Sequence, residues 1–162
     1  MRKSLFAASV IALALAACSP PANVNPNAQQ QAGAQVAAAA PASCETPAQP
    51  VALGATVNTN IPAARSYPEN ARYFCFEAPA GVSSITITLS GMSADLDLFV
   101  GSNGIQSVQG VDLQQGQTYE WMSNAQGTAT DSVTINNPRA GVYYVEVVSF
   151  MGEASPYTLA IR

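Results

Sequence analysis

Two aspartates spaced two residues apart, Asp95 and Asp97, are the side chains whose spacing most suggests chemistry. On one face of a β-strand their carboxylates would lie about 6–7 Å apart, a separation that paired acids use in glycoside hydrolysis. Carboxylate oxygens also bind Ca²⁺, and Asp112, Asp131 or loop carbonyls could complete a calcium site. A third interpretation is a solvated acidic edge that discourages pairing with other chains. Acid/base catalysis requires a carboxyl of raised pKa in a cleft, so hydrolysis is the least favoured of the three.

The composition removes most other catalytic chemistry. The 162 residues contain no His, which excludes Ser-His-Asp and Cys-His arrangements. The lysine at position 3 belongs to the N-terminal signal described below, so Schiff-base chemistry and a phosphate-binding P-loop have no lysine to use. Four arginines and ten acidic residues remain after that signal, a balance that disfavours DNA or RNA binding. We therefore expect a protein that is not an enzyme and requires no cofactor, with calcium as the ion to test.

Two aromatic residues, Tyr119 and Trp121, offer a different kind of site. Their spacing places both rings on one strand face, with Phe99, Tyr144 and Phe150 as candidate neighbours. Aromatic faces are surfaces on which sugar or peptide ligands stack. The alternative is that both rings belong to the core.

Residues 1–17 have the features of a secretory signal peptide. Two basic residues precede an apolar run over 5–14, which is shorter than the roughly 20 residues that a bilayer-spanning helix needs. The following Leu-Ala-Ala-Cys over 15–18 resembles the lipobox of bacterial lipoproteins. This resemblance implies cleavage before Cys18, acylation of that residue and anchoring to a membrane. Ser19, which is not Asp, implies the outer membrane of a Gram-negative bacterium, with the domain in the periplasm or at the cell surface.

Residues 18–43 have the composition of a flexible tether. After Cys18 this segment carries no charged and no aromatic side chain, so it has little apolar surface to bury. The next two cysteines, Cys44 and Cys75, form an even pair in an exported and oxidising setting, which predicts a disulfide. Closing that loop would stabilise the fold by roughly 3–4 kcal/mol in the chain-entropy model. Two free thiols are the alternative.

From residue 44 to residue 162 the pattern predicts an all-β domain. Apolar residues alternate with polar ones, β-branched residues are frequent, and Gly, Pro and Asn mark turns between the alternating runs. The predicted strands cover 72–78, 85–89, 95–98, 118–122, 132–136, 141–149 and 156–161. About seven or eight short strands of this kind predict an antiparallel sandwich or barrel.

Alternation also predicts which side chains form the core of such a sandwich. The inward set is Phe74, Phe76, Ile85, Ile87, Leu89, Leu96, Leu98, Val100, Val133, Ile135, Tyr143, Val145, Val147, Tyr157, Leu159 and Ile161. Asp95, Asp97 and Phe99 are then expected to point outward. Cys75 lies on the face opposite Phe74, so a bridge to Cys44 would hold the preceding segment across the outer side of the sheet.

Four stretches taken together resemble the bacterial pre-peptidase C-terminal domain: 72–81, 94–100, 138–147 and 156–159. The resemblance covers about residues 53–162 and implies a jelly-roll type β-sandwich, similar to the collagen-binding domains of clostridial collagenases, which bind calcium. Such domains usually follow a secreted peptidase. No peptidase precedes this one in the sequence, so the family's usual roles in secretion, folding or substrate engagement have no attached enzyme on which to act.

The sequence therefore predicts a non-catalytic envelope lipoprotein. Its first functional interpretation is a binding or accessory module for an extracellular or periplasmic protein or polysaccharide. The alternative is a structural or assembly lipoprotein that partners another envelope protein or a secreted peptidase. A carboxylate-dependent hydrolase built on Asp95 and Asp97 is the third and least favoured interpretation.

Overall fold

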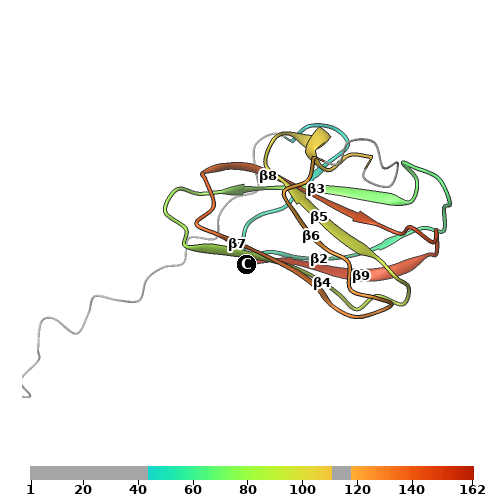
Figure 1. Cartoon of the computed structure of the whole chain (residues 1–162). Helices are drawn as coiled ribbons and strands as arrows, with labels where there is room; N and C mark the ends of the chain where they lie inside the picture. Colours follow the sequence, from blue (N-terminus) through green and yellow to red (C-terminus); the bar gives the residue numbers. More distant parts are fainter. Residues whose placement is uncertain (1–43, 111–117) are drawn as a thin grey trace, which may run out of the picture. The chain divides into compact units, whose positions relative to one another are not determined.

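The structure, a computed structural model, describes residues 44–110 and 118–162 (Figure 1). The predictions for the signal peptide, Cys18 and the tether lie outside the described residues, as does the suggested calcium ligand Asp112. Within the described ranges, no helix combines the length and the hydropathy needed to cross a membrane.

Two β-sheets pack face to face (Figure 1). In the first, the strands lie in the order β1-β3-β8-β5-β6, with bounds β1 Gln49–Pro50, β3 Ala71–Ala78, β8 Gly141–Val148, β5 Asp97–Gly101 and β6 Trp121–Ser123. In the second, the order is β2-β9-β4-β7, with bounds β2 Thr56–Ile61, β9 Ser155–Ile161, β4 Ser84–Ser90 and β7 Asp131–Asn136. A short 3-10 helix, η1, covers Ile105–Ser107. The predicted β-sandwich class is confirmed.

The core between the sheets consists of the side chains that alternation assigned to it. Every one of the sixteen predicted inward residues is buried in this cluster, because period-two alternation places one face of each strand toward the facing sheet. The structure adds Val51, Ile61, Ala78 and Met92 to the buried members. Phe76 and Tyr143 stack across β3 and β8 with ring centroids 5.4 Å apart.

The outer face of the five-stranded sheet is also covered. A second apolar cluster buries Tyr73, Cys75, Phe99 and Val148 beneath η1 and the segment that begins at Cys44. Phe99 points outward from the sandwich as expected, yet only 4% of it is exposed. Alternation placed Phe99 on the correct face, but that face packs under a further layer of chain.

Two strands, β1 and β2, were not predicted. The sequence of β2 is Thr-Val-Asn-Thr-Asn-Ile, in which polar residues also occupy some inward positions and weaken the alternation signal. In β1, Pro50 is a residue that strands disfavour, and the element has only two residues. It pairs with β3 in parallel, so the sandwich is not wholly antiparallel as predicted.

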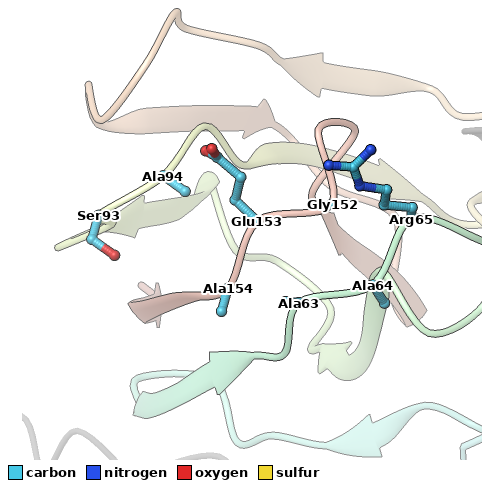
Figure 2. Close-up of a pocket in the computed structure, with 8 residues that line it drawn as sticks. All are labelled: Ala63, Ala64, Arg65, Ser93, Ala94, Gly152, Glu153 and Ala154. Atoms are coloured by element: carbon cyan, nitrogen blue, oxygen red, sulfur yellow. The ribbon is translucent and has the colours of Figure 1, made fainter.

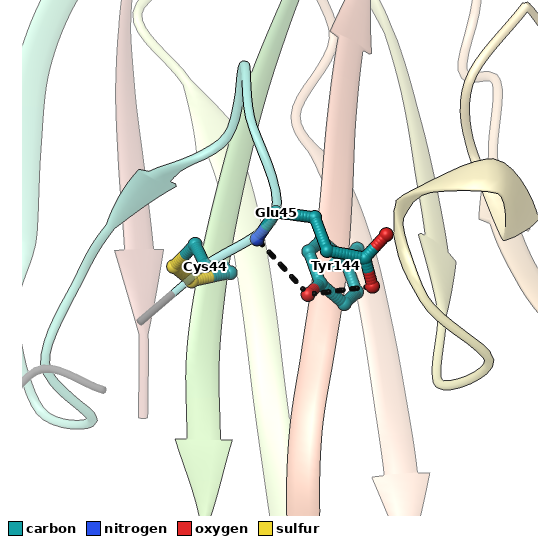
Figure 3. Close-up of a disulfide and its surroundings, with 4 residues drawn as sticks. Cys44, Glu45 and Tyr144 are labelled. Atoms are coloured by element: carbon teal, nitrogen blue, oxygen red, sulfur yellow. Dashed lines mark hydrogen bonds between the residues drawn. A yellow bond between two sulfur atoms is a disulfide. The ribbon is translucent and has the colours of Figure 1, made fainter. Parts of the chain in front are cut away.

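A disulfide joins Cys44 to Cys75 at the centre of β3 (Figure 3). The two Cα atoms lie 6.2 Å apart, within the range that a bridge spans. The neighbouring Glu45 contributes two contacts to Tyr144 on β8: its backbone N donates to the phenol oxygen at 3.3 Å, and the phenol donates to Oε1 at 3.2 Å. The predicted bridge therefore holds the start of the described chain across the outer side of the sheet.

Candidate functional site

The aspartates of the sequence hypothesis form a partly buried acidic cluster at the start of β5. Burial, followed by the carboxylates of Asp95 and Asp131, raises the pKa of Asp97 to about 6. Oδ1 of Asp95 is buried without a hydrogen-bond partner. Because β5 lies between β8 and β6, the interpretation of these residues as a solvated edge is wrong.

A raised carboxyl pKa is one requirement for acid catalysis, and Asp97 meets it. The second requirement is a cleft, and the residues that line the two cavities described below include neither Asp95 nor Asp97. Among the described residues, no group of three or more His, Cys, Asp or Glu side chains is arranged to hold a metal ion. Calcium binding through Asp95 and Asp97 stays a prediction.

Asp131 has a clear structural task at the turn from β6 to β7. Its Oδ1 accepts hydrogen bonds from Ser123 Oγ at 2.6 Å and from the backbone N of Ala125 at 2.8 Å. Ser123 Oγ accepts in turn from the backbone N of Ser132 at 3.2 Å. These bonds fix the corner at which the chain passes from one sheet to the other.

The two aromatic candidates lie in different parts of the molecule. Trp121 packs against the core between the sheets, with its ring centroid 6.0 Å from that of Tyr143. Tyr119 packs against the outer cluster, with its ring centroid 5.0 Å from that of Phe99. The predicted shared face is therefore wrong: β6 begins only at Trp121, so strand alternation does not extend back to Tyr119. Contact of either ring with a ligand stays a prediction.

The larger of the two cavities is an open groove of about 660 Å³ formed by three connecting segments (Figure 2). They are the chain after β2, the chain after β4 and the turn between β8 and β9. The lining residues are Ala63, Ala64, Arg65, Ser93, Ala94, Gly152, Glu153 and Ala154. Most of these side chains are small, so the backbone forms much of the wall.

Hydrogen bonds hold the three segments of the groove together. The backbone N of Ala64 donates to the carbonyl of Gly152 at 3.1 Å. Ser155 Oγ accepts from the backbone N atoms of Ser93 at 2.8 Å and of Ala94 at 3.2 Å. Gly152 has φ +71°, and a Cβ there would lie 2.5 Å from the Ala64 carbonyl oxygen. Glycine is thus required where the two segments approach.

Two opposite charges flank the groove. Arg65 and Glu153 are both exposed, and Figure 2 shows their side chains extending toward the same side of the groove. Within the described part of the chain, neither charged group forms a hydrogen bond or an ion pair. The groove thus offers an unpaired guanidinium and an unpaired carboxylate beside an uncharged floor of small residues.

The second cavity, of about 250 Å³, lies beside the turn into β8 and is lined in part by Ser102, Asn103 and Arg139. The polar groups of Ser102 and Asn103 are already engaged, because Glu120 Oε1 accepts from Asn103 Nδ2 at 3.1 Å and from the backbone N of Ser102 at 3.0 Å. This arrangement fixes the loop after β5 and leaves a smaller opening than the groove.

Sequence reasoning missed the groove. Apart from Arg65 and Glu153, the lining residues are Ala, Gly and Ser from three separated connections. These residue types do not indicate a binding site in a sequence. Arg65 and Glu153 are 88 positions apart, so only the folded chain places them at one site. The turn signal Met151-Gly152 was the one feature of this region that the sequence indicated.

The chain is similar to a known protein family and to solved structures. The family model described as the bacterial pre-peptidase C-terminal domain matches residues 70–149. A search of curated proteins found no match. Two solved structures are similar. The pre-peptidase C-terminal domain of a collagenase from Bacillus anthracis has 16% identity and a TM-score of 0.48, and the match covers 68% of this chain and 90% of that one. PliG of Aeromonas hydrophila, a periplasmic inhibitor of g-type lysozyme, has 18% identity and a TM-score of 0.46, and the match covers 66% of this chain and 82% of that one. Residues 70–149 of this chain thus match the bacterial pre-peptidase C-terminal domain family, which the sequence resemblance predicted.

Proposed function

We propose that this protein is a lipid-anchored, non-catalytic module of the bacterial envelope that binds a partner protein in the groove of Figure 2. The observation that carries the proposal is the pair of unpaired, opposite charges beside a floor of small side chains. An extended segment of a partner can approach the backbone of such a floor closely. Its own acidic and basic side chains would then pair with Arg65 and Glu153.

The membrane anchor is part of this proposal. The Leu-Ala-Ala-Cys motif over 15–18 supports lipidation of Cys18, and the tether composition of 18–43 supports a domain held away from the lipid surface. Anchoring confines the module to two dimensions beside its partner, which raises their effective concentration. A modest groove affinity is then sufficient for function.

Charge-neutralising variants test the groove. Cells that make the tagged full-length protein are treated with formaldehyde, and the protein is purified with its cross-linked partners. We expect the wild type to recover a discrete partner protein. Arg65→Ala/Glu153→Gln should reduce that recovery at least fivefold, because both complementary charges are lost.

A matched pair of charges on another surface provides the control. Glu77 and Arg139 are exposed and lie outside the groove, so Glu77→Gln/Arg139→Ala removes the same charges elsewhere. This variant should recover the partner at the wild-type level. Equal recovery by the wild type and the groove variant, or an equal loss in both variants, contradicts the proposal. Recovery of glycan alone, with no protein, also contradicts it.

A further inference from the structure

The outward face of the four-stranded sheet has an unusual composition. Its four strands, β2, β4, β7 and β9, contain a single charged residue, Asp131, which is fully buried. They contain a single aromatic residue, Tyr157, which packs into the core. The side chains that alternate with the core positions are Thr56, Asn58, Asn60, Ser84, Thr86, Thr88, Ser90, Ser132, Thr134, Asn136, Pro156, Thr158 and Ala160.

Strand register arranges these residues in rows across the sheet. One row runs Thr56, Ala160, Thr88 and Ser132, and it crosses all four strands. The neighbouring rows contain lateral hydrogen bonds between side chains: Thr158 Oγ1 donates to Asn58 Oδ1 at 2.8 Å, and the hydroxyls of Thr86 and Thr134 lie 3.2 Å apart. The result is an ordered array of hydroxyl, amide and methyl groups with no net charge. Neighbouring strands of the sheet lie about 4.8 Å apart, and this distance spaces the side chains along each row.

Several classes of partner do not suit this face. Nucleic acids, acidic polysaccharides and anionic lipids need several cations. These strands contain none, and the guanidinium of Arg162, which follows β9 beside this face, is already engaged with the Ala55 carbonyl and Thr56 Oγ1. Protein interfaces draw their affinity from Trp, Tyr and Arg. The outward positions of these four strands hold none of the three, and the guanidinium of Arg162 beside them is bonded to the chain itself. Four strands of six or seven residues present roughly 400 Å², whereas a stable protein interface buries about 800 Å² per partner. A second copy of this chain is disfavoured for the same reasons.

We propose that this face is a docking surface for a neutral, hydroxyl-rich polysaccharide. Hydroxyl and amide side chains can exchange hydrogen bonds with sugar hydroxyls, and the threonine methyl groups can contact the apolar faces of sugar rings. The uncharged array is complementary to an uncharged polymer. This inference adds a second ligand class, on a second surface, to the proposed function, and it rests on that function only for the membrane anchor.

The same composition predicts how binding behaves. No aromatic ring on this face can stack on a sugar, so the affinity for each sugar unit is low. Binding then requires contacts with several sugars at once along the rows. A polymer is therefore recognised, and its constituent monosaccharide does not compete with it.

Native electrophoresis through gels that contain a soluble polysaccharide tests this inference, because even weak binding slows migration. The probes are dextran, hydroxyethyl cellulose and galactomannan as neutral polymers, with polygalacturonate as the acidic comparison. We expect at least one neutral polymer to slow the delipidated protein, and polygalacturonate to leave its mobility unchanged. Thr86→Val/Thr88→Val/Thr134→Val should weaken the retardation at least fivefold, since valine keeps the threonine shape and strand propensity but removes the hydroxyl.

Two further variants keep the outcome interpretable. Thr134→Val alone, on the edge strand β7, should weaken retardation about twofold and fold even if the triple variant does not. Thr128→Val, at an exposed position outside the strands, should migrate as the wild type.

Absence of retardation in all three neutral polymers overturns the inference, as does equal retardation of the wild type and both face variants. Sedimentation showing a dimer that the face variants abolish identifies a second copy as the occupant and also overturns it. Arg65→Ala/Glu153→Gln should retain the retardation, so the two proposals fail separately.

Discussion

Asp97 carries a carboxyl group whose pKa the fold raises above that of a free side chain. Its neighbours and its partial burial raise its pKa from 3.8 to about 6, so the folded protein binds a proton there more tightly than the unfolded chain does. The ionised carboxylate therefore costs stability above pH 6, and that cost disappears as the pH falls through 6 toward 4. A bound cation would stabilise this ionised carboxylate in the folded protein. Calcium binding by Asp97 therefore stays a prediction.

Asp97→Asn is expected to raise the melting temperature at pH 7.5 by a few degrees. The expected gain is about 1 kcal/mol after allowance for solvent screening of a half-buried carboxylate. Thermal melts of the variant and the wild type at pH 4.5 should differ less than at pH 7.5. A variant that melts at or below the wild-type temperature at pH 7.5 contradicts this assignment.

At the scale of elements, the corner between β6 and β7 depends on the hydrogen bonds of one side chain, Asp131. Asp131 accepts the hydrogen bonds that turn the chain from one sheet to the other, and it is fully buried. The turn itself is polar and exposed around Gly127, so packing contributes little to its geometry. The carboxylate determines how this edge of the sandwich closes.

Asp131→Ala should lower the free energy of unfolding by about 2–3 kcal/mol, because two donors lose a charged acceptor in a buried position. Ser123→Ala, which removes one of those donors, should cost about 1 kcal/mol. Urea unfolding at pH 7.5 measures both values. If Asp131→Ala costs no more than Ser123→Ala, the corner is held by other contacts.

The strands also show which parts of the fold the sequence patterns could predict. Six of the predicted strands are present because each alternates apolar with polar side chains, and all sixteen predicted core residues are buried. The strand predicted over 118–122 begins only at Trp121. β2 was missed because Thr59 occupies an inward position where an apolar residue would have marked the pattern. Alternation assigned Phe99 to the outward face correctly, but it does not reveal that further chain covers that face.

At the scale of the whole molecule, the structure shows where uncharged polar side chains gather, on the outward face of the four-stranded sheet. Charged residues make up only 10% of the chain, and the outward positions of β2, β4, β7 and β9 hold none of them. The sequence could not reveal these rows, because they arise only when four separated strands align. The groove was equally unpredictable, since its small residues come from three distant connections.

The anchor gives a prediction for the full-length protein. Cells grown with radiolabelled palmitate should transfer label to the wild type, and Cys18→Ser should abolish it, because the thiol is the proposed acylation site. The variant should also leave the membrane fraction. Cys44→Ser, which breaks the disulfide instead, should still be labelled. Labelling of Cys18→Ser at the wild-type level would contradict lipidation at this residue.

The central claim is that the groove contacts a partner protein in the envelope. The most direct test replaces Ala154, an exposed groove residue, with the photoreactive amino acid benzoylphenylalanine in the full-length protein in living cells. Thr130, an exposed residue that does not line the groove, carries the same probe as the control. Illumination should yield a discrete cross-linked protein band from position 154 and none from position 130. No band from position 154, or the same band from both positions, would contradict the claim.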